Sequence, residues 1–288
     1  MARHQGLAAP FQRDHRKRGL ALEGGRTGGS RVSEATTEFY EGFGGAQLAL
    51  HRMGAGRPVV MLHGLFSSTE TNWIRYGAAQ ALADAGFECL MPDLRAHGKS
   101  AAPHDPAAYP PDVLVLDLKA LVAHLGLDDY DLVGFSLGSR TSARGVLAGL
   151  SPRRLVLAGM GLEGLAGWAR RRDFFFDVID RFGTIKPGDK AYFAQQFLKT
   201  TGTDPVAARL LLATMEDTPP EALSAIVMPT LVLCGADDND NGSADRLAEA
   251  LPKPVRVTIP GTHMSSVTTP EFRREIARFL AGQVNRPT

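Results

Sequence analysis

One serine stands where a strand is expected to turn sharply into a helix. It is the central residue of Gly134-Phe135-Ser136-Leu137-Gly138, which follows the apolar run Tyr130 to Val133 and precedes a stretch compatible with a helix. Such a turn forces its middle residue into a strained backbone conformation, and small flanking residues let the chain pass. Ser136 is therefore a candidate nucleophile, although the same pattern also occurs in ordinary turns between a strand and a helix.

A serine hydroxyl is a poor nucleophile until a base takes its proton, and histidine has a suitable pKa. Three further apolar runs end in glycine-containing turns that carry polar residues, at residues 59–66, 231–238 and 255–263. The last of these turns, Pro260-Gly261-Thr262-His263, makes His263 the candidate base. His63 and His97 also precede glycines in loops, where a histidine can tie a turn together by hydrogen bonds rather than transfer a proton.

A carboxylate must then hold the imidazole tautomer and stabilise the imidazolium as it forms. Asp237, Asp238 and Asp240 crowd one turn. Glu163 follows another strand-like run, Arg154 to Ala158. The residues by themselves leave the choice of acid open.

Two more motifs lie upstream of the serine. The first is His63-Gly64-Leu65-Phe66-Ser67-Ser68 followed by Asn72-Trp73, and the second is Met91-Pro92-Asp93-Leu94-Arg95-Ala96-His97-Gly98-Lys99-Ser100. Together with the serine pentapeptide and the two later turns, they follow the order typical of the α/β-hydrolase superfamily, which the chain resembles from about residue 36 to its C-terminus. The first motif is similar to the corresponding stretch of small-molecule esterases in that superfamily.

The resemblance implies roles for particular groups. The acid of the superfamily commonly lies three residues after the glycine that ends its strand, which points to Asp238, with Asp237 as the second choice. Some members place the acid after the earlier strand, so Glu163 is a third candidate. The backbone N–H groups of Leu65 and Leu137 would form the oxyanion hole. No cofactor is implied, and no metal-ligand cluster stands out in the sequence.

The elements that must position these residues alternate between strand and helix. Residues 39–52 are typical of a hairpin with Gly44-Gly45 at its turn. The expected strands are residues 59–62, 87–91, 130–135, 154–158, 230–234 and 255–259, and the expected helices include residues 73–85 and 112–125. Such alternation implies a mostly parallel central sheet flanked by helices on both faces. The predicted fold class is therefore α/β, and the resemblance implies the α/β-hydrolase fold.

The alternation breaks between residues 160 and 223. This stretch holds six of the 14 phenylalanines, at helical spacings such as Phe174, Val178 and Phe182. We predict a helical cap insertion at 160–223 within a core domain of residues 36–159 and 224–288. In the superfamily such a cap closes over the nucleophile. Its aromatic residues favour a substrate with an apolar portion, although a small helical layer also needs aromatics to bury itself.

The composition is typical of an enzyme with a substantial core. The chain has 288 residues, of which 44% are hydrophobic and 22% charged, and a net charge of +1 that argues against nucleic acid as a partner. No run approaches the roughly 18 consecutive apolar residues that span a bilayer. The basic run Arg13 to Arg18 interrupts any secretory signal, so we expect a cytoplasmic protein with no membrane partner. The oligomeric state is not indicated.

Two further features have plain structural interpretations. Residues 1–35 are predicted to be a disordered, basic and glycine-rich tail. Cys89 and Cys234 each lie inside an apolar run, so both are predicted to be small buried hydrophobic residues without a redox role.

The nucleophile type narrows the reaction. Epoxide hydrolases and haloalkane dehalogenases of the superfamily need a carboxylate where this chain has Ser136. We therefore predict a serine hydrolase that cleaves a carboxylic ester of a small apolar substrate through an acyl-serine intermediate. A carbon–carbon bond hydrolase, a lactonase, a thioesterase, an amidase or a lyase would keep the same motifs. A ligand-binding homologue without catalysis is the weakest alternative.

Overall fold

The computed structural model describes residues 34–283. The predicted tail, residues 1–35, lies outside the described residues except for its last two positions.

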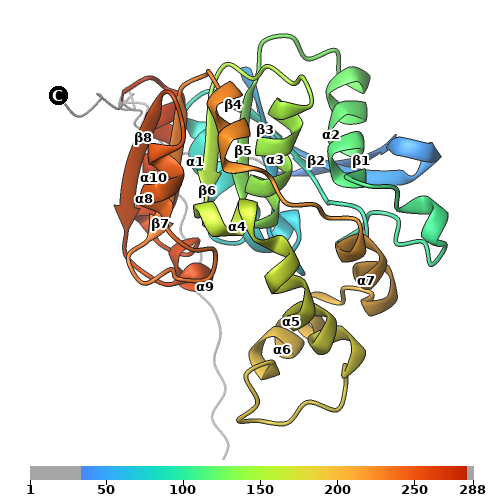
Figure 1. The fold of residues 1–288 in the computed structure, drawn as a ribbon. Coiled ribbons are helices and arrows are strands. Elements are labelled where there is room, and N and C mark those ends of the chain that lie inside the picture. The colour runs from blue at the N-terminus through green and yellow to red at the C-terminus, as the bar shows by residue number, and fades with distance from the viewer. Residues whose placement is uncertain (1–33, 284–288) are drawn as a thin grey trace, which may run out of the picture. The chain divides into compact units, whose positions relative to one another are not determined.

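Within this range, eight strands form one sheet (Figure 1). They are β1 (Thr36–Glu41), β2 (Gln47–Gly54), β3 (Arg57–Leu62), β4 (Phe87–Pro92), β5 (Asp131–Phe135), β6 (Leu155–Ala158), β7 (Thr230–Gly235) and β8 (Pro254–Ile259). Their order across the sheet is β1-β2-β4-β3-β5-β6-β7-β8. Strand β2 is antiparallel to both its neighbours, and all other neighbouring pairs are parallel. The predicted α/β class with a mostly parallel sheet is confirmed.

The helices of the described residues follow most of the strands. They are α1 (Ala78–Asp84), α2 (Val113–His124), α3 (Leu137–Leu147), α4 (Leu162–Ala166), α5 (Trp168–Asp180), α6 (Tyr192–Thr201), α7 (Pro205–Ala213), α8 (Ala244–Glu249), α9 (His263–Ser266) and α10 (Pro270–Leu280). Shorter turns are the 3₁₀ helices η1 (Phe43–Gly45), η3 (Pro106–Ala108) and η4 (Pro220–Ala225) and the π-helical turn η2 (Glu70–Ile74).

Helices cover both faces of the sheet because its strands alternate their side chains between two hydrophobic cores. In β3, Val60 and Leu62 belong to the core shared with α2, α3 and α8. Val59 and Met61 belong to the opposite core, shared with α1 and α10. Burial on both faces explains why the strands appear in the sequence as continuous apolar runs.

The register brings the functional turns to one edge of the sheet. Leu62 at the end of β3 pairs with Gly134 of β5, so the turn after β3 begins beside the serine pentapeptide. Gly235 pairs with Ile259, so the turns after β7 and β8 begin side by side. Carboxyl ends of parallel strands meet at a common edge, which is where ligands bind in open α/β sheets.

Two local predictions had different outcomes. The hairpin is confirmed, since β1 and β2 pair and Gly44 and Gly45 both have positive φ between them. The helix expected at about residues 73–85 is confirmed over Ala78–Asp84 but is not continuous from residue 73. The chain forms η2 and α1 instead, separated at Gly77, whose φ of 75° lies in the left-handed region. Gly77 adopts that conformation at no steric cost. It therefore separates η2 from α1, although the spacing of the apolar residues alone suggested one continuous helix.

The segment between β6 and β7 is helical, as the break in alternation predicted. It contains α4 to α7, and Figure 1 shows α5, α6 and α7 grouped together beyond the end of the sheet. Its aromatic residues pack partly against one another, as in the stacked pair Trp168 and Phe175. The boundaries of a separate cap at 160–223 stay a prediction.

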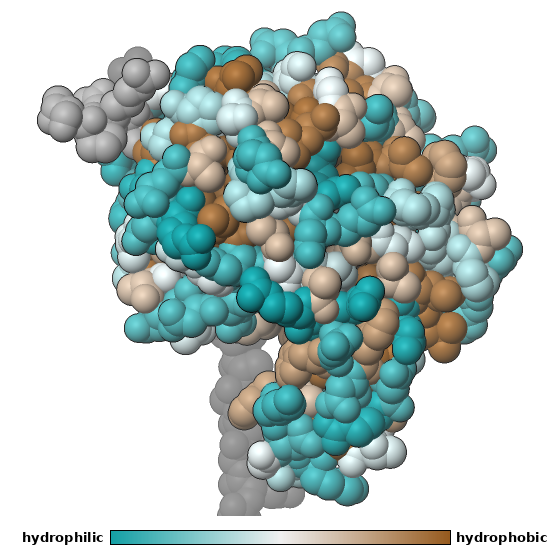
Figure 2. Space-filling view, viewed as in Figure 1, coloured by the Kyte–Doolittle hydropathy of each residue, from teal (hydrophilic) through white to brown (hydrophobic). Residues whose placement is uncertain are grey.

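The remaining features are the polarity of the surface, the length of the helices and the two cysteines. Hydrophilic and hydrophobic residues are interspersed over the face drawn in Figure 2. None of the helices formed by the described residues is long and apolar enough to cross a membrane. Cys89 and Cys234 are free and buried, as predicted, and burial raises the pKa of each thiol, to about 12 and about 11 respectively.

Candidate active site

Ser136 lies at the sharp turn between β5 and α3. Its φ is 54° and its ψ is −111°, a conformation that is rare for a residue with a side chain. The Ser136 N–H donates to the carbonyl of Ala158 at 2.8 Å, which holds the turn against β6. Its side chain does not cap α3 and is therefore available for other contacts. The strained elbow that the pentapeptide predicted is present.

The flanking glycines are required because backbone passes close to them. A Cβ atom at Gly138 would collide with the carbonyl group of Leu62, and one at Gly134 would collide with the backbone of Gly138. Backbone atoms of two packed elements cannot move aside as a flexible side chain can.

Replacing Gly138 with alanine should therefore lower the free energy of unfolding by about 3 kcal/mol or more. Thermal or urea unfolding would measure it. Gly126→Ala is the control, because nothing lies within 4 Å of the added methyl group and only the cost of a positive φ applies. An equal effect of the two substitutions would contradict the collision at Gly138.

The predicted base and nucleophile lie within hydrogen-bond distance. His263, the first residue of α9, has its Nε2 3.0 Å from the Ser136 Oγ. Its Nδ1 is 3.0 Å from Oδ2 of Asp238. If Nδ1–H donates to the carboxylate, Nε2 is free to accept the serine proton. This is the order of contacts that activates a serine.

Of the candidate acids, Asp238 is the one that contacts His263. Its side chain is 2% exposed, and its second oxygen accepts from the Asp240 N–H at 3.2 Å. Asp237, one residue earlier, is exposed. Glu163 accepts from the Ser243 N–H at 2.8 Å and pairs with Arg246, so it ties α4 to the start of α8.

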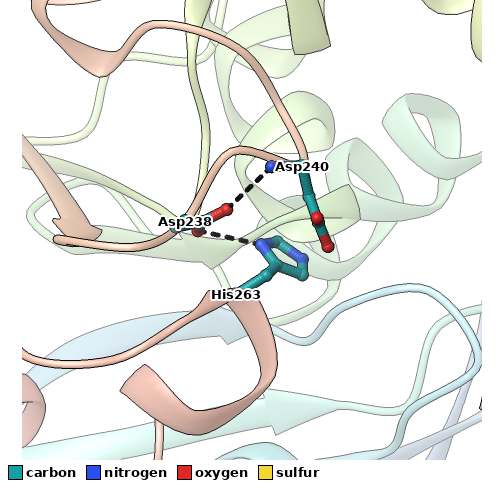
Figure 3. Close-up of side chains that lie close together, drawn as sticks. All are labelled: Asp238, Asp240 and His263. Carbon is teal, nitrogen blue, oxygen red and sulfur yellow. Dashed lines mark hydrogen bonds and ion pairs between the residues drawn. The ribbon is translucent and has the colours of Figure 1, made fainter.

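Asp240 is a second carboxylate near the imidazole, which the sequence did not single out for this place. Figure 3 shows Asp238 and Asp240 on either side of His263. One ligand atom from each of the three residues lies within 4.8 Å of the others, so this is the group among the described residues that could hold a metal ion. Both nitrogens of His263 already have partners, and a metal ion would have to displace one of them.

Phe135 supports the imidazole in a way that its position in the pentapeptide did not reveal. The rings of Phe135 and His263 are stacked, with centroids 4.9 Å apart and planes inclined by 28°. Phe135 is itself packed edge-on against Phe272 of α10. The stack limits rotation of His263 and shields one side of it from water.

A cavity of about 540 Å³ opens onto Ser136 and His263. Residues of the core and of the helical segment line it together. Its phenylalanines are Phe66 and Phe135 from the core and Phe174, Phe175, Phe193 and Phe197 from α5 and α6. Arg171 and Asp240 also reach it. The lining of the cavity is thus largely apolar and rich in phenylalanine, with several polar and charged side chains among it.

The loop after β3 lies against the serine. A Cβ atom at Gly64 would be 3.5 Å from the Ser136 Cβ, and Leu65 lines the cavity. Leu137 is the first residue of α3, directly after the serine. Both predicted oxyanion donors therefore belong to segments that adjoin Ser136.

His63 and His97 are fully buried beneath this loop. Each ring nitrogen makes one hydrogen bond to the backbone. The ring of His63 bonds to Gly64 and Leu94, and the ring of His97 bonds to Phe66 and Arg95. Burial lowers the pKa of His63 below its ordinary value and that of His97 from 6.5 to about 3. Both rings are therefore neutral at physiological pH and tie loops together, as their place before glycines suggested.

The neutral state of His97 predicts a loss of stability in acid. Between pH 6.5 and about 3 the unfolded chain binds a proton at this ring and the folded chain does not, so stability falls as the pH falls through this window. From pH 7 to pH 4.5, His97 should account for about 2–3 kcal/mol of the lost free energy of unfolding. Urea unfolding at both pH values would show a smaller loss for His97→Gln than for the unmodified protein. Equal losses would mean that His97 is charged in the folded state.

Comparisons with known proteins agree on one kind of fold. A family model described as alpha/beta hydrolase fold matches residues 57–155. A non-heme haloperoxidase from Rhodococcus erythropolis is 29% identical over 227 residues, which are 67% of this chain and 79% of the relative. An epoxide hydrolase from Caballeronia sordidicola is 33% identical over 110 residues, and the match spans only 32% of that relative's length. The solved structure of a thermophilic esterase from Thermogutta terrifontis superposes with a TM-score of 0.69 at 23% identity, covering 87% of this chain and 100% of the other.

Proposed function

Because this chain belongs to the α/β-hydrolase superfamily, we propose that it is a serine hydrolase that cleaves a carboxylic ester of a small apolar substrate. One observation carries the proposal: the series of contacts from Ser136 to His263 to Asp238, each 3.0 Å long, beside a cavity whose lining is largely apolar and rich in phenylalanine. No cofactor is needed for this reaction.

In the first half of the reaction, the Ser136 Oγ attacks the ester carbonyl carbon while Nε2 of His263 takes the hydroxyl proton. The imidazolium that forms is stabilised by the buried Asp238 carboxylate at Nδ1. Negative charge collects on the carbonyl oxygen, where the N–H groups of Leu65 and Leu137 would bind it. The dipole of α3, which begins at Leu137, favours the same charge.

The tetrahedral intermediate then loses its alcohol. His263 returns the proton to the leaving oxygen, and the acyl group stays on Ser136 as an ester. In the second half, His263 takes a proton from water, the hydroxide attacks the acyl carbon, and the carboxylic acid is released. Ser136 recovers its proton from His263, so the cycle closes without any other reactant.

The residue at the nucleophile position supports ester chemistry over epoxide hydrolysis. In this superfamily an epoxide hydrolase needs a carboxylate to form its alkyl-ester intermediate, and residue 136 is serine. The match to the relative named epoxide hydrolase covers a third of that protein, so its name does not extend to this chain. Lactones, thioesters, amides and carbon–carbon bonds remain substrates that the same three side chains can attack.

Hydrolysis of p-nitrophenyl acyl esters, from short to long acyl chains, tests the proposal. We expect turnover with release of a carboxylic acid, and stoichiometric labelling of Ser136 by a fluorophosphonate. Labelling without ester turnover would move the proposal to amides, thioesters or carbon–carbon bonds. Ligand binding with neither labelling nor turnover would favour a binding protein.

The cavity predicts that aromatic side chains of α5 limit substrate size. Replacing Phe174 with alanine should raise kcat/KM for esters with bulky acyl groups by at least ~10-fold relative to acetyl esters, because one methylene in an apolar pocket already shifts discrimination by this order and alanine lacks a whole phenyl ring. Phe176→Ala is the matched control, since Phe176 is on the same helix but contacts Arg172 and Arg209 rather than the cavity. An unchanged acyl preference in Phe174→Ala would remove α5 from the substrate site.

A further inference from the structure

Two buried histidines outside the proposed Ser136, His263 and Asp238 set contact the loop that carries Leu65. His63 is 0% exposed and His97 is 1% exposed, and their rings meet edge to face with centroids 5.3 Å apart. Each ring makes one hydrogen bond through each nitrogen, and every partner is a backbone group. The four backbone partners lie in two loops, Gly64 and Phe66 after β3 and Leu94 and Arg95 after β4, so the two imidazoles join these loops.

The partners dictate which nitrogen of each ring carries the proton. A backbone N–H can only donate, so Nε2 of His63, 2.9 Å from the Leu94 N–H, must be the unprotonated acceptor. Nδ1 of His63 then carries the hydrogen and donates to the Gly64 carbonyl at 2.8 Å. The same reasoning applies to His97, whose Nε2 accepts from the Phe66 N–H at 3.0 Å and whose Nδ1–H donates to Arg95.

The Gly64 carbonyl belongs to the same peptide group as the Leu65 N–H. In a planar trans peptide the C=O and the N–H point in opposite directions, so fixing one fixes the other. His63 therefore helps to set the direction of the Leu65 N–H without touching it, together with the Ser67 N–H, which donates to the same carbonyl at 3.3 Å. A hydrogen bond at the carbonyl oxygen also polarises the amide and makes its N–H a stronger donor.

The next peptide group is held in the same way. The Phe66 N–H, which donates to His97, belongs to the peptide that joins Leu65 to Phe66. Phe66 has a φ of 55°, a left-handed conformation that the surrounding contacts must maintain. Leu65 thus has a hydrogen-bonded peptide plane on each side, and little freedom is left for its N–H to rotate.

We propose that His63 and His97 are positioning residues that aim the Leu65 N–H at the developing oxyanion, with His63 acting through the Gly64 carbonyl. This rests on the proposed function, in which Leu65 is an oxyanion donor. Preorganised donors are effective because they need no reorientation as charge develops. The neutral rings serve best, since a charged imidazole could not accept from Leu94 or Phe66.

Two substitutions at His63 separate positioning from stability. Asparagine carries an amide nitrogen near the place of Nδ1, so His63→Asn keeps the donor to Gly64 and loses the acceptor for Leu94. Glutamine carries an amide oxygen near the place of Nε2, so His63→Gln keeps the acceptor and loses the donor. The two variants therefore exchange which of the two contacts is missing.

We expect His63→Gln to unfold near the temperature of the unmodified protein but to lose ~10-fold or more in kcat with little change in KM, because the contact matters in the transition state. His63→Asn should unfold at a lower temperature and keep most of its kcat. The rate at which a fluorophosphonate labels Ser136 should follow kcat. His124→Gln, a change of a surface histidine at the end of α2, is the control.

The opposite pattern, or a wild-type labelling rate and kcat in a folded His63→Gln, would overturn the inference. If His63→Gln does not fold, the same kcat and labelling rate are compared between His97→Gln and His97→Leu. Only glutamine can still accept a hydrogen bond from the Phe66 N–H. If the unmodified protein is not labelled at Ser136, the proposed function itself fails. Labelling of the unmodified protein with no difference among folded variants contradicts the positioning role alone.

Discussion

Ser136→Ala should lower kcat for the preferred ester by at least ~10³-fold while leaving the fold intact. The loss is large because alanine removes the atom that forms the acyl intermediate, and water attack assisted by the remaining groups is much slower. The Ser136 side chain does not cap α3, so its removal costs the helix nothing. Steady-state kinetics and a thermal unfolding curve for the same preparation would measure both effects.

Ser142→Ala is the matched control for this substitution. Ser142 is in α3, the helix that follows Ser136; it is buried, and its Oγ has no hydrogen-bond partner among the described residues. Its removal should change neither kcat nor fluorophosphonate labelling. Near-normal turnover in Ser136→Ala would refute Ser136 as the nucleophile, and loss of activity in both variants would indicate damage to α3 rather than to the chemistry.

Asp238→Asn should lower kcat by roughly 10³-fold or more, whereas Asp237→Asn should have little effect. The asparagine is nearly the same size as aspartate but has no negative charge to stabilise the imidazolium, and its NH₂ group favours the wrong tautomer of His263. Asp237 is exposed and one residue away, so it controls for a change of charge in the same turn. The measurement is kcat for both variants at several pH values.

Asp240 makes this prediction more informative. Its carboxylate also lies near His263. If Asp238→Asn keeps residual activity and the double variant with Asp240→Asn loses it, Asp240 partly replaces the missing charge. A severe effect of Asp237→Asn with a mild effect of Asp238→Asn would transfer the acid role to Asp237.

Much of the fold could be predicted because the parallel strands are buried on both faces. Runs such as Val59 to Leu62 are continuous and apolar, and each ends in a turn whose glycine and polar residues stand out. The helix from Val113 to His124 was recognisable by its repeating leucines and valines. The helix expected at residues 73–85 begins only at Ala78, because a single residue, Gly77, turns the chain where the apolar spacing continues.

The sequence predicted some residues of the candidate site more fully than others. Ser136 and His263 stand in turns with a recognisable pattern, and the structure brings them within 3.0 Å. The choice between Asp237 and Asp238 depends on which side chain points toward the imidazole. The resemblance to the superfamily pointed to Asp238 ahead of Asp237 by its place after Gly235, and the contact between Asp238 and His263 agrees with that choice.

The sequence by itself determined the alternation of strands and helices, the sharp turn at Ser136 and the order of the polar turns, because these depend on local steric demands and on the spacing of apolar residues. Only the tertiary structure decided that Phe135 stacks on His263, that Asp240 lies beside it, and that His63 and His97 hold the backbone around Leu65. These contacts join residues as far apart as 128 positions, in Phe135 and His263. They follow from how the ends of neighbouring strands meet at one edge of the sheet, which no local pattern encodes.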